Sequence, residues 1–517
     1  MGEGRLPALL LPYGPYPELA LHVHDLTIQG RQAETLTAAD EAEGIAAALG
    51  DARTIRSIRL GRMYALTALG RLHEALAVGE QLTAADRPVA GPRSTDAKIL
   101  ADTAEVLIKM GRIDDGLQHL ARALVLLETA PRGDVRYVSA MSSLCEAAKA
   151  AELFELADEC LGVANDVLDF SDLYRSSADI QRAELRLEWG LRLEQVGRAG
   201  EALRLYATSV PLLEHWAPRM PEAPLASALL SLSLAKTGRH DEALAIVRAL
   251  LMPMRTSGQD HEARLLHLAH GIVLRDTGDL RGARREFTAA EELATQPGQR
   301  LIFRYELAVL AAVEVPGEAA QSMLSALRGQ VEMLWQLRLD RRTMLQQAYR
   351  RVELEAARSS ADHAAASDAL TGLGNRRLFD RRIQAVSGSG TLLLIDVDRF
   401  KSINDEFSHG VGDRVLTEIA AVLRAHCRHD EVAIRFGGDE FAMFLAASEH
   451  EGRQVAERIR QVIGTRDWSA IAPGLRVTLS MGLAACQAGE SGRELYDRAD
   501  ARLYAAKRAG RNRLAAA

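Results

Sequence analysis

Apolar positions follow two different rhythms along the chain. Over most of the first three hundred residues they recur three or four positions apart, as in Met63, Leu66 and Leu69, which places them on one face of an α-helix. After Asp368 they gather instead in short continuous runs of strand length, starting with TLLLIDVDRF at 391–400. The pattern predicts a multidomain protein with an all-α N-terminal part and an α+β C-terminal part.

A short phrase recurs through the helical part. Each copy is a helical run, then Gly, a polar or basic residue and soon a small pair such as Glu-Ala, and successive copies lie 39 to 46 residues apart. Gly suits the left-handed residue that commonly ends a helix. Ala75, Ala202 and Ala243 are small enough for the second helix of a pair to approach the first. A period near 40 predicts an α-solenoid, and the array resembles tetratricopeptide (TPR) repeats. The copies are centred on Gly70, Gly111, Ala151 in place of Gly, Gly197, Gly238, Gly278 and Gly317.

The repeats carry no catalytic pattern, and two roles stay open for them. They form a rigid spacer or dimerisation platform, or they offer a concave groove to an unknown protein or peptide. His267 and His270 lie three positions apart on a predicted helix. We expect ordinary core or solvated histidines, because no carboxylate or third histidine stands at matching spacing for a metal.

A long helix is predicted between the two parts, at 327–367. No Pro occurs between Pro316 and Pro473, and apolar residues approximate a 3–4 spacing that Arg341 interrupts. A short dimeric coiled coil and a lone helix that caps the repeats both fit this pattern. The apolar positions are Val331, Leu334, Leu337, Leu345, Ala348 and Val352.

Strands and helices alternate in the C-terminal part. Apolar runs predict strands at 391–400, 431–436, 441–446 and 475–485, with amphipathic helices at 411–427 and up to Gly510. The Gly-Gly-Asp-Glu stretch between the second and third runs indicates a hairpin, with glycines at positive φ and acids at the tip. The predicted domains are an N-terminal segment (1–40), the solenoid (41–326), the connecting helix (327–367) and a C-terminal domain (368–517).

Composition excludes several classes of protein. Of the 517 residues, 48% are hydrophobic and 26% are charged, which rules out wholesale disorder. The net charge of −7 gives no global reason to bind nucleic acid. No run of about 18 apolar residues is present, so we expect no membrane insertion. Four cysteines without a CxxC pair and an N-terminus without signal-peptide features predict a cytoplasmic protein.

The chemistry-bearing residues lie in the C-terminal part. Asp396 and Asp398 end the first strand run on one face of an extended chain, and Asp439 lies in the hairpin. Carboxylates brought together in this way can hold a divalent cation, and an oxygen-only ligand set suits Mg²⁺. With Lys401, Lys507 and Arg511 near them, the predicted ligand is a polyphosphate, and the predicted chemistry is metal-assisted phosphoryl or nucleotidyl transfer.

Five motifs in this region resemble the GGDEF domain of the diguanylate cyclase family. They occur in the family's order and at compatible spacing. They are DALTGLGNRR at 368–377, DVDRFKSIND at 396–405, HGVGD at 409–413, the signature RFGGDEF at 435–441, and the closing motif, with Ala499-Asp500, Tyr504, Ala506-Lys507 and GRNR at 510–513.

This resemblance implies an activity and a set of site residues. The family joins two GTP molecules into cyclic di-GMP, releases two pyrophosphates and has a palm, ferredoxin-like fold. Mg²⁺, with Mn²⁺ as the alternative, would be held by Asp396, the Val397 carbonyl and Asp439. Asp439 or Glu440 would be the base for the attacking 3′-hydroxyl. The triphosphate would be bound by backbone N–H groups of Phe400 and Lys401, by the Lys401 side chain, and by Lys507 and Arg511, which suit phosphate contacts.

Guanine selection can be argued from side-chain chemistry. Asn404 offers one donor and one acceptor, and Asp413 accepts twice, which complements the guanine edge. Against adenine these groups would stay unpaired, at about 1–3 kcal/mol each. By resemblance His409 also lies near the nucleotide, although a structural role in the loop fits it as well.

One GTP per domain cannot react alone, because each attacks the other's α-phosphorus. Two domains must therefore face each other around a two-fold axis, and we expect a homodimer formed through the repeats, the connecting helix or both. The alternatives are a catalytically silent GGDEF receptor for GTP or cyclic di-GMP and a pure interaction scaffold. Arg428 and Glu431 stand where many family members carry an Arg-x-x-Asp product-inhibition site, and Glu in place of Asp weakens that expectation.

Overall fold

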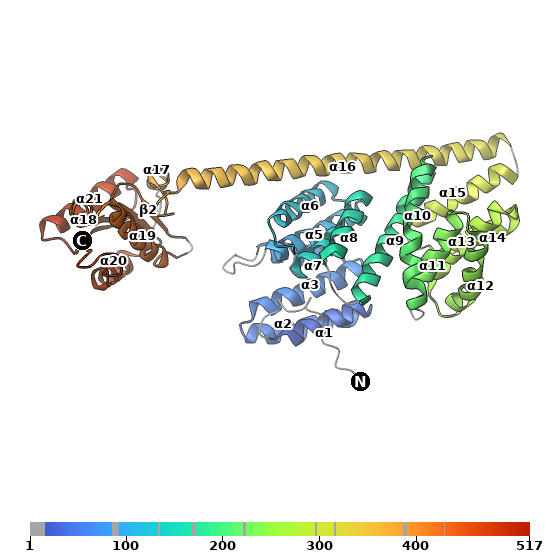
Figure 1. The fold of residues 1–517 in the computed structure, drawn as a ribbon, viewed down its shortest axis with the longest axis horizontal. Helices are drawn as coiled ribbons and strands as arrows, with labels where there is room; N and C mark the ends of the chain where they lie inside the picture. Colours follow the sequence, from blue (N-terminus) through green and yellow to red (C-terminus); the bar gives the residue numbers. More distant parts are fainter. Residues whose placement is uncertain are drawn as a thin grey trace. The chain divides into compact units, whose positions relative to one another are not determined.

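A computed structural model describes residues 16–84, 93–132, 135–167, 172–220, 224–294, 297–314, 317–385, 390–428 and 430–516. The first fifteen residues of the predicted N-terminal segment lie outside this set. The chain divides into two units, Met1–Glu353 and Leu354–Ala517. The boundaries predicted at 40 and 327 fall within helices, α2 and α16 (Figure 1).

The first unit is helical throughout its described residues. Each helix packs on the next, and alternate helices such as α5 and α7 or α11 and α13 also contact each other, as expected for stacked helix pairs. The name of the repeat family stays a prediction. The helices are α1 (Pro17–Ile28), α2 (Gln32–Ala48), α3 (Ala52–Ala68), α4 (Leu72–Ala84), α5 (Arg93–Lys109), α6 (Ile113–Glu128), α7 (Val135–Ala150), α8 (Phe154–Val167), α9 (Asp172–Gln195), α10 (Ala199–Trp216), the short 3₁₀ helix η2 (Ala217–Arg219), α11 (Leu225–Lys236), α12 (His240–Thr256), α13 (Asp260–Asp276), α14 (Leu280–Glu292) and α15 (Pro297–Glu314).

Left-handed residues end the first helix of successive pairs, as the repeated Gly predicts. Gly70, Gly111, Gly197, Gly238 and Gly278 all have φ between 72° and 94°. In the degenerate copy the prediction is wrong by one residue. There Glu152, with φ 58°, takes the left-handed conformation, while Ala151 is the preceding helix end.

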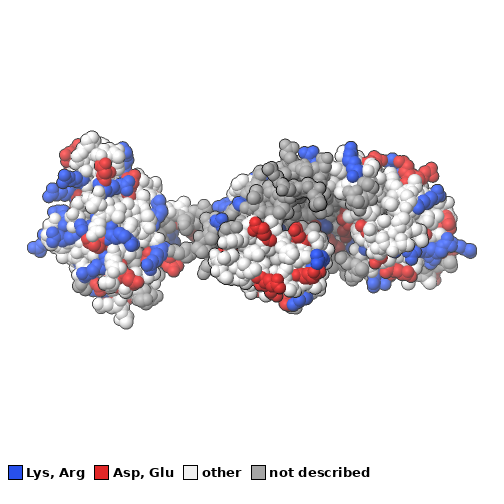
Figure 2. Space-filling model, turned by 90° about the horizontal axis from the view of Figure 1, so that it is seen from below, with Lys and Arg blue, Asp and Glu red and all other residues white. Residues whose placement is uncertain are grey.

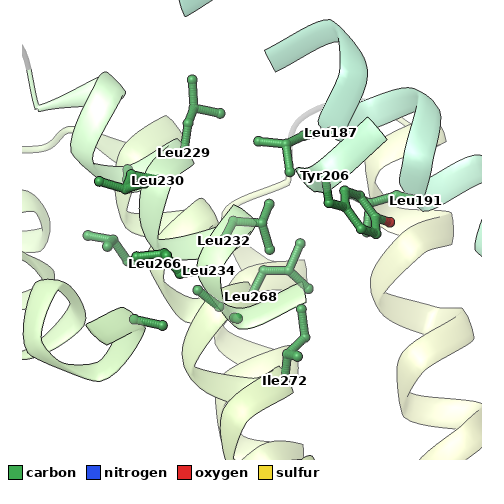
Figure 3. Close-up of a cluster of buried hydrophobic side chains, with 14 of the residues drawn as sticks. Leu187, Leu191, Tyr206, Leu229, Leu230, Leu232, Leu234, Leu266, Leu268 and Ile272 are labelled. Atoms are coloured by element: carbon green, nitrogen blue, oxygen red, sulfur yellow. The ribbon is translucent and has the colours of Figure 1, made fainter. Parts of the chain in front are cut away.

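Small residues set the distance between paired helices. The predicted close-packing positions Ala75, Ala202 and Ala243 are fully buried. A Cβ on Gly190 of α9 would lie 2.3 Å from Cε1 of Tyr206 on α10, so the glycine makes room for the ring. Tyr206 joins a core in which leucines of α9, α11 and α13 meet (Figure 3).

The helix α16 (Glu318–Ala366) is one unbroken element of 49 residues (Figure 1). Within the first unit its Trp335 and Arg338 are buried against the repeats. The Arg338 guanidinium stacks 4.4 Å from the Trp335 ring, donates to the Glu152 carbonyl (2.8 Å) and pairs with Glu155. This part of α16 is therefore fixed to the repeat array by a buried cation.

The apolar positions predicted for a coiled coil lie on different faces of α16. Val331 and Leu345 are buried in the first unit, whereas Leu334 and Leu337 are 43% and 47% exposed. Arg341, which interrupts the spacing, donates to the carbonyl of Ala151 (3.2 Å). Over this stretch α16 has the contacts expected of a helix that caps the repeats, and the coiled coil stays a prediction.

The second unit is built on one five-stranded sheet in the order β2-β3-β1-β4-β5. β1 is antiparallel to both β3 and β4, so the four longer strands and two intervening helices form the split βαβ arrangement of ferredoxin-like domains. The strands are β1 (Thr391–Val397), β2 (Val432–Arg435), β3 (Glu440–Leu445), β4 (Leu479–Ala485) and β5 (Leu514–Ala515).

Helices cover both faces of the sheet. Leu393, Ile395 and Val397 of β1 pack with α19 and α20, while Leu392 and Leu394 pack with α17 and α21. β1 is therefore buried on both sides, which explains its continuous apolar run. The predicted run reached residue 400, but Phe400 begins a helix. The helices are α17 (Arg376–Gln384), α18 (Phe400–Phe407), α19 (His409–Ala425), α20 (Glu449–Thr465) and α21 (Gly492–Arg508).

Charged side chains of both signs are spread over the visible face of the molecule (Figure 2).

On α13, His267 and His270 meet a carboxylate that the spacing argument did not find. It is Glu286 of α14, and the distances from its oxygens to Nδ1 of the two histidines are 2.7 and 3.3 Å. No helix in the described residues is long and apolar enough to cross a membrane.

Candidate active site

Three carboxylates meet where β1 ends beside the β2–β3 turn. Asp396 of β1 is the register partner of Glu440, the first residue of β3. Asp439 precedes it in the turn, and its carbonyl accepts a hydrogen bond from the Val397 N–H (3.1 Å). The ladder thus brings together four of the predicted site residues: Asp396, Val397, Asp439 and Glu440.

The hairpin glycines act differently from the prediction. Neither Gly437 nor Gly438 has positive φ. A Cβ on Gly437 would lie 2.4 Å from a carboxylate oxygen of Glu440. Glycine at 437 therefore leaves space for the Glu440 side chain to fold over the turn, beside Asp439.

Lys507 of α21 supplies the nearest positive charge. Its Nζ lies 2.6 Å from Oδ2 of Asp396. Burial raises the pKa of Asp396, and the charges of Asp439 and Glu440 raise it further, while Lys507 acts in the opposite direction. Burial is the largest of these causes, and the pKa of Asp396 stays above its ordinary value despite the contact with Lys507.

The donor set fits a magnesium ion. Asp396, Asp439 and the Val397 carbonyl present only oxygen, and Mg²⁺ is commonly held by one or two carboxylates, with waters and substrate phosphates completing its shell. No group of three His, Cys, Asp or Glu side chains in the described residues has the geometry of a metal centre.

Asp398 has a different role from Asp396. Its side chain is buried and accepts hydrogen bonds from Thr478 Oγ1 (2.7 Å), Ser480 Oγ (2.6 Å) and the backbone N–H of Asn512 (2.9 Å). Both of its oxygens are engaged by protein donors. The sequence places Asp398 on the same face as Asp396, but only the fold reveals its partners.

A helix N-terminus follows β1 directly. Arg399 turns the chain with φ 56°, and Phe400 and Lys401 open α18. The first N–H groups of a helix have no intrahelical partner and favour anions. The Lys401 side chain is exposed and has no hydrogen-bond partner among the described residues.

Asn404 and Asp413 lie on either side of a strained corner between α18 and α19. Ser408 at this corner has φ 127° and ψ 160°. A Cβ on Gly412 would lie 1.9 Å from Oδ1 of Asn404, so the amide rests against the glycine. Within the described part of the chain, the side chains of Asn404 and Asp413 form no hydrogen bond or ion pair with another residue. His409 is exposed at the start of α19.

Arg511 lies in the turn after α21. Gly510, Arg511 and Asn512 have φ values of 113°, 63° and 44°. The Arg511 side chain is exposed and unpaired within the described residues. Helix α21 ends at Arg508. Lys507 therefore lies in the last turn of the helix, and Arg511 follows it by four residues.

The predicted product-inhibition residues lie before β2. Glu431 folds back, and its Oε2 accepts a hydrogen bond from the backbone N–H of Arg428 (2.8 Å). A cavity of about 690 Å³ lies beside them and is lined by Glu431, Cys427, Arg424 and residues of the end of α16. A role for Arg428 and Glu431 in product binding stays a prediction.

Sequence reasoning missed the link between the opening motif and the signature turn. Arg435 donates to the Gly438 carbonyl (3.1 and 2.7 Å) and to the Asp368 carboxylate (3.2 and 3.3 Å). Arg435 therefore links the turn beside Asp439 to the Asp368 carboxylate. The available signal was that Asp368 and Arg435 are oppositely charged and stand in two of the five motifs without an assigned role.

The C-terminal part of the chain is similar to known proteins. Residues 365–513 match the family described as diguanylate cyclase, GGDEF domain. The diguanylate cyclase DgcP of Pseudomonas aeruginosa is 41% identical over 158 residues, 29% of this chain and 24% of its own length. DgcM of Escherichia coli is 40% identical over 30% of this chain and 39% of its own. DgcS of Shewanella oneidensis is 36% identical over 28% of this chain and 50% of its own. The chain thus spans a quarter to a half of these relatives.

Solved structures of GGDEF-domain proteins also match part of the chain. The coiled coil and GGDEF domain of DgcB from Caulobacter crescentus, in complex with c-di-GMP, is 32% identical over 34% of this chain and 98% of that chain, with a TM-score of 0.31. The diguanylate cyclase SiaD from P. aeruginosa, in complex with its activator SiaC, is 28% identical over 47% of this chain and all of that chain, with a TM-score of 0.34. By the sequence matches, residues 365–513 of the chain are similar throughout to the GGDEF domain of diguanylate cyclases.

Proposed function

We propose that this protein is a diguanylate cyclase, which condenses two GTP molecules into cyclic di-GMP and releases two pyrophosphates. The observation that carries the proposal is the β1–β3 register, which sets Asp396 opposite Glu440 with Asp439 in the adjoining turn. The match to the family described as diguanylate cyclase, GGDEF domain, spans residues 365–513 and so includes these residues.

Asp396, the Val397 carbonyl and Asp439 would hold Mg²⁺, with Mn²⁺ as the alternative. When bound, such an ion supplies charge neutralisation on the triphosphate and polarises the phosphorus–oxygen bonds. The placement of Asp439 and Glu440 beside the buried Asp396 supports this assignment, since a cation stabilises the charged form of a buried carboxylate.

The reaction joins the 3′-oxygen of one GTP to the α-phosphorus of the other. The bond from that phosphorus to the oxygen that bridges it to the β-phosphate breaks, and pyrophosphate leaves with the electron pair. Asp439 or Glu440 takes the 3′-hydroxyl proton. Lys401, Lys507, Arg511 and the first N–H groups of α18 hold the charge that builds up on the phosphates.

Guanine is selected by Asn404 and Asp413. The Asn404 amide can donate once and accept once, and the Asp413 carboxylate can accept twice, which complements the O6 acceptor and the N1–H and N2–H donors of guanine. Adenine would leave these groups unpaired, at about 1–3 kcal/mol each. Their availability within the described residues supports the assignment, and His409 stands at the same corner.

The reaction needs two domains face to face, so the working form is a homodimer. We assign the repeats and α16 the role of forming or adjusting that dimer, with an unknown protein or peptide as a regulator of the repeats. The continuous α16 and the burial of its Arg338 on the repeats support this role.

Removing one acid from the cluster tests the catalytic assignment. The purified chain is incubated with GTP and MgCl₂, and products are separated by liquid chromatography. Asp439→Ala should lower cyclic di-GMP formation by about a hundredfold or more. The control Asp497→Ala, at an exposed acid of α21, should leave it unchanged. A wild-type chain that binds GTP without turnover would instead favour a silent receptor.

A further inference from the structure

A buried carboxylate next to the proposed metal ligands has no assigned role in the reaction. Asp398 is 7% exposed. Its Oδ1 accepts from Ser480, and its Oδ2 accepts from Thr478 and from the N–H of Asn512. The first two partners belong to the neighbouring strand region, whereas the third lies 114 residues away in sequence, in the turn that carries Arg511.

That turn is strained. Arg511 and Asn512 both have positive φ and follow Gly510, which also has positive φ. A non-glycine residue in the left-handed region costs about 1–2 kcal/mol, so such a turn persists only where its surroundings hold it. Two charged side chains do so at Asn512. Asp398 accepts from its N–H, and Arg460 of α20 donates to its side-chain oxygen (2.9 Å) and its carbonyl (3.3 Å).

The strained turn fixes the backbone from which the Arg511 side chain extends. The Arg511 N–H donates to the Ala506 carbonyl (3.2 Å), which ties the turn to the helix end that carries Lys507. Lys507 in turn contacts Asp396. Asp396 and Asp398, two residues apart, therefore hold the two ends of one cationic segment, the first through Lys507 and the second through Asn512.

We propose that Asp398 is a positioning residue that orients Arg511 toward the terminal phosphates of a guanosine triphosphate. The proposal rests on the proposed function for the identity of the ligand. Asp398 touches neither the ligand nor the cation; it fixes the backbone of Asn512, and thereby the guanidinium of the preceding residue. Loss of Asp398 should weaken the grip on the β- and γ-phosphates and leave recognition of the guanosine part intact.

Binding measurements on the full chain separate these two effects. Dissociation constants are measured by calorimetry with Mg²⁺ for guanosine 5′-(α,β-methylene)triphosphate, which cannot release pyrophosphate, and for GMP. Asp398→Ala should raise the constant for the triphosphate about tenfold and change that for GMP less than twofold. Asp398→Asn should restore tight binding, because its amide oxygen still accepts from Asn512 while the Ser480 hydroxyl turns to accept from the amide N–H₂.

Three further variants complete the test. Ser480→Ala removes the donor to Oδ1 of Asp398, the oxygen that does not contact Asn512. It should not alter the ratio of the two constants. Arg460→Ala breaks the second restraint on Asn512 and should raise the triphosphate constant about threefold, which keeps the proposal testable if Asp398→Ala does not fold. In an Arg511→Ala background, Asp398→Ala should add less than twofold.

The outcomes separate the positioning role of Asp398 from the proposed cyclase function. Equal losses for triphosphate and GMP, no loss for either, or an undiminished effect without Arg511 would overturn the positioning role of Asp398 while leaving the cyclase assignment intact. A wild-type chain that binds neither guanine nucleotide would overturn the proposed function, and the positioning role with it.

Discussion

At the residue scale, Ser408 shows how the corner between α18 and α19 departs from ordinary backbone geometry. Its φ of 127° and ψ of 160° lie in a region that is essentially restricted to glycine. The Ser408 hydroxyl accepts only a long hydrogen bond from Val411 N–H (3.4 Å) at the start of α19. The strain therefore outweighs the weak cap.

Replacing Ser408 with Gly should stabilise the C-terminal domain. Glycine adopts this conformation without a steric penalty and loses only a few tenths of a kcal/mol as a cap. We expect the free energy of unfolding to rise by about 1 kcal/mol, measured by urea denaturation with hydrogen exchange of the sheet amides. A decrease would show that the hydroxyl matters more than the backbone strain.

The contact between Gly412 and Asn404 gives a test of guanine recognition. In Gly412→Ala the new Cβ would lie 1.9 Å from Oδ1 of Asn404, so the amide must move. We expect the KM for GTP to rise about tenfold. Gly410→Ala is the control, because the nearest atom to its Cβ is 3.9 Å away. Equal KM values for the two variants would remove Asn404 from the guanine site.

At the element scale, sequence reasoning succeeds where partners are local and fails where they are distant. The β2–β3 turn and the end of β1 each carry their acids within a few residues, so the cluster of Asp396 and Asp439 could be predicted. The role of Asp398 could not, because Asn512 meets it only through the folded sheet. Helix α20 was missed although Ser448 and Glu451 form a capping box at its start, a signal readable from sequence.

The helix pair α13–α14 provides a pH-dependent prediction. Burial raises the pKa of Glu286, but hydrogen bonds from His267 and then His270 outweigh it and lower the pKa to about 2. A carboxyl with a lowered pKa stabilises the fold above its ordinary pKa of about 4.5 and loses that contribution as the pH falls toward 2.

Glu286→Gln should therefore reduce the acid sensitivity of the N-terminal unit. Thermal unfolding of wild type and variant is compared from pH 6 to pH 2. The two should differ most above pH 4.5 and converge as the pH approaches 2. A gap that stays constant over this range would mean that the ion pair with His267 and His270 does not contribute.

At the scale of the whole molecule, α16 is the element that belongs to both units. Its first part is fixed by Arg338, which lies between aromatic rings and pairs with Glu155. The guanidinium is buried, whereas the Glu155 side chain is 34% exposed, so the loss of Arg338 acts mainly through its ring contacts and its packing. The contacts of Arg338 therefore contribute to holding this stretch of α16 on the helices of the first unit.

Arg338→Ala should release that stretch. We expect faster hydrogen exchange over residues 331–345 and a loss of about 2 kcal/mol in the stability of the N-terminal unit. Arg328→Ala, at an exposed position of the same helix, is the matched control. Unchanged exchange in Arg338→Ala would show that other contacts hold α16.

The central claim is that two copies of the chain, each holding one GTP, make one cyclic dinucleotide. The most direct measurement is the product balance of the wild-type chain with GTP and Mg²⁺ over a range of protein concentrations. Cyclic di-GMP should form with two pyrophosphates per product, and the specific activity should rise with protein concentration until the dimer is saturated. GTP that stays intact, or is only hydrolysed, at every concentration would contradict it.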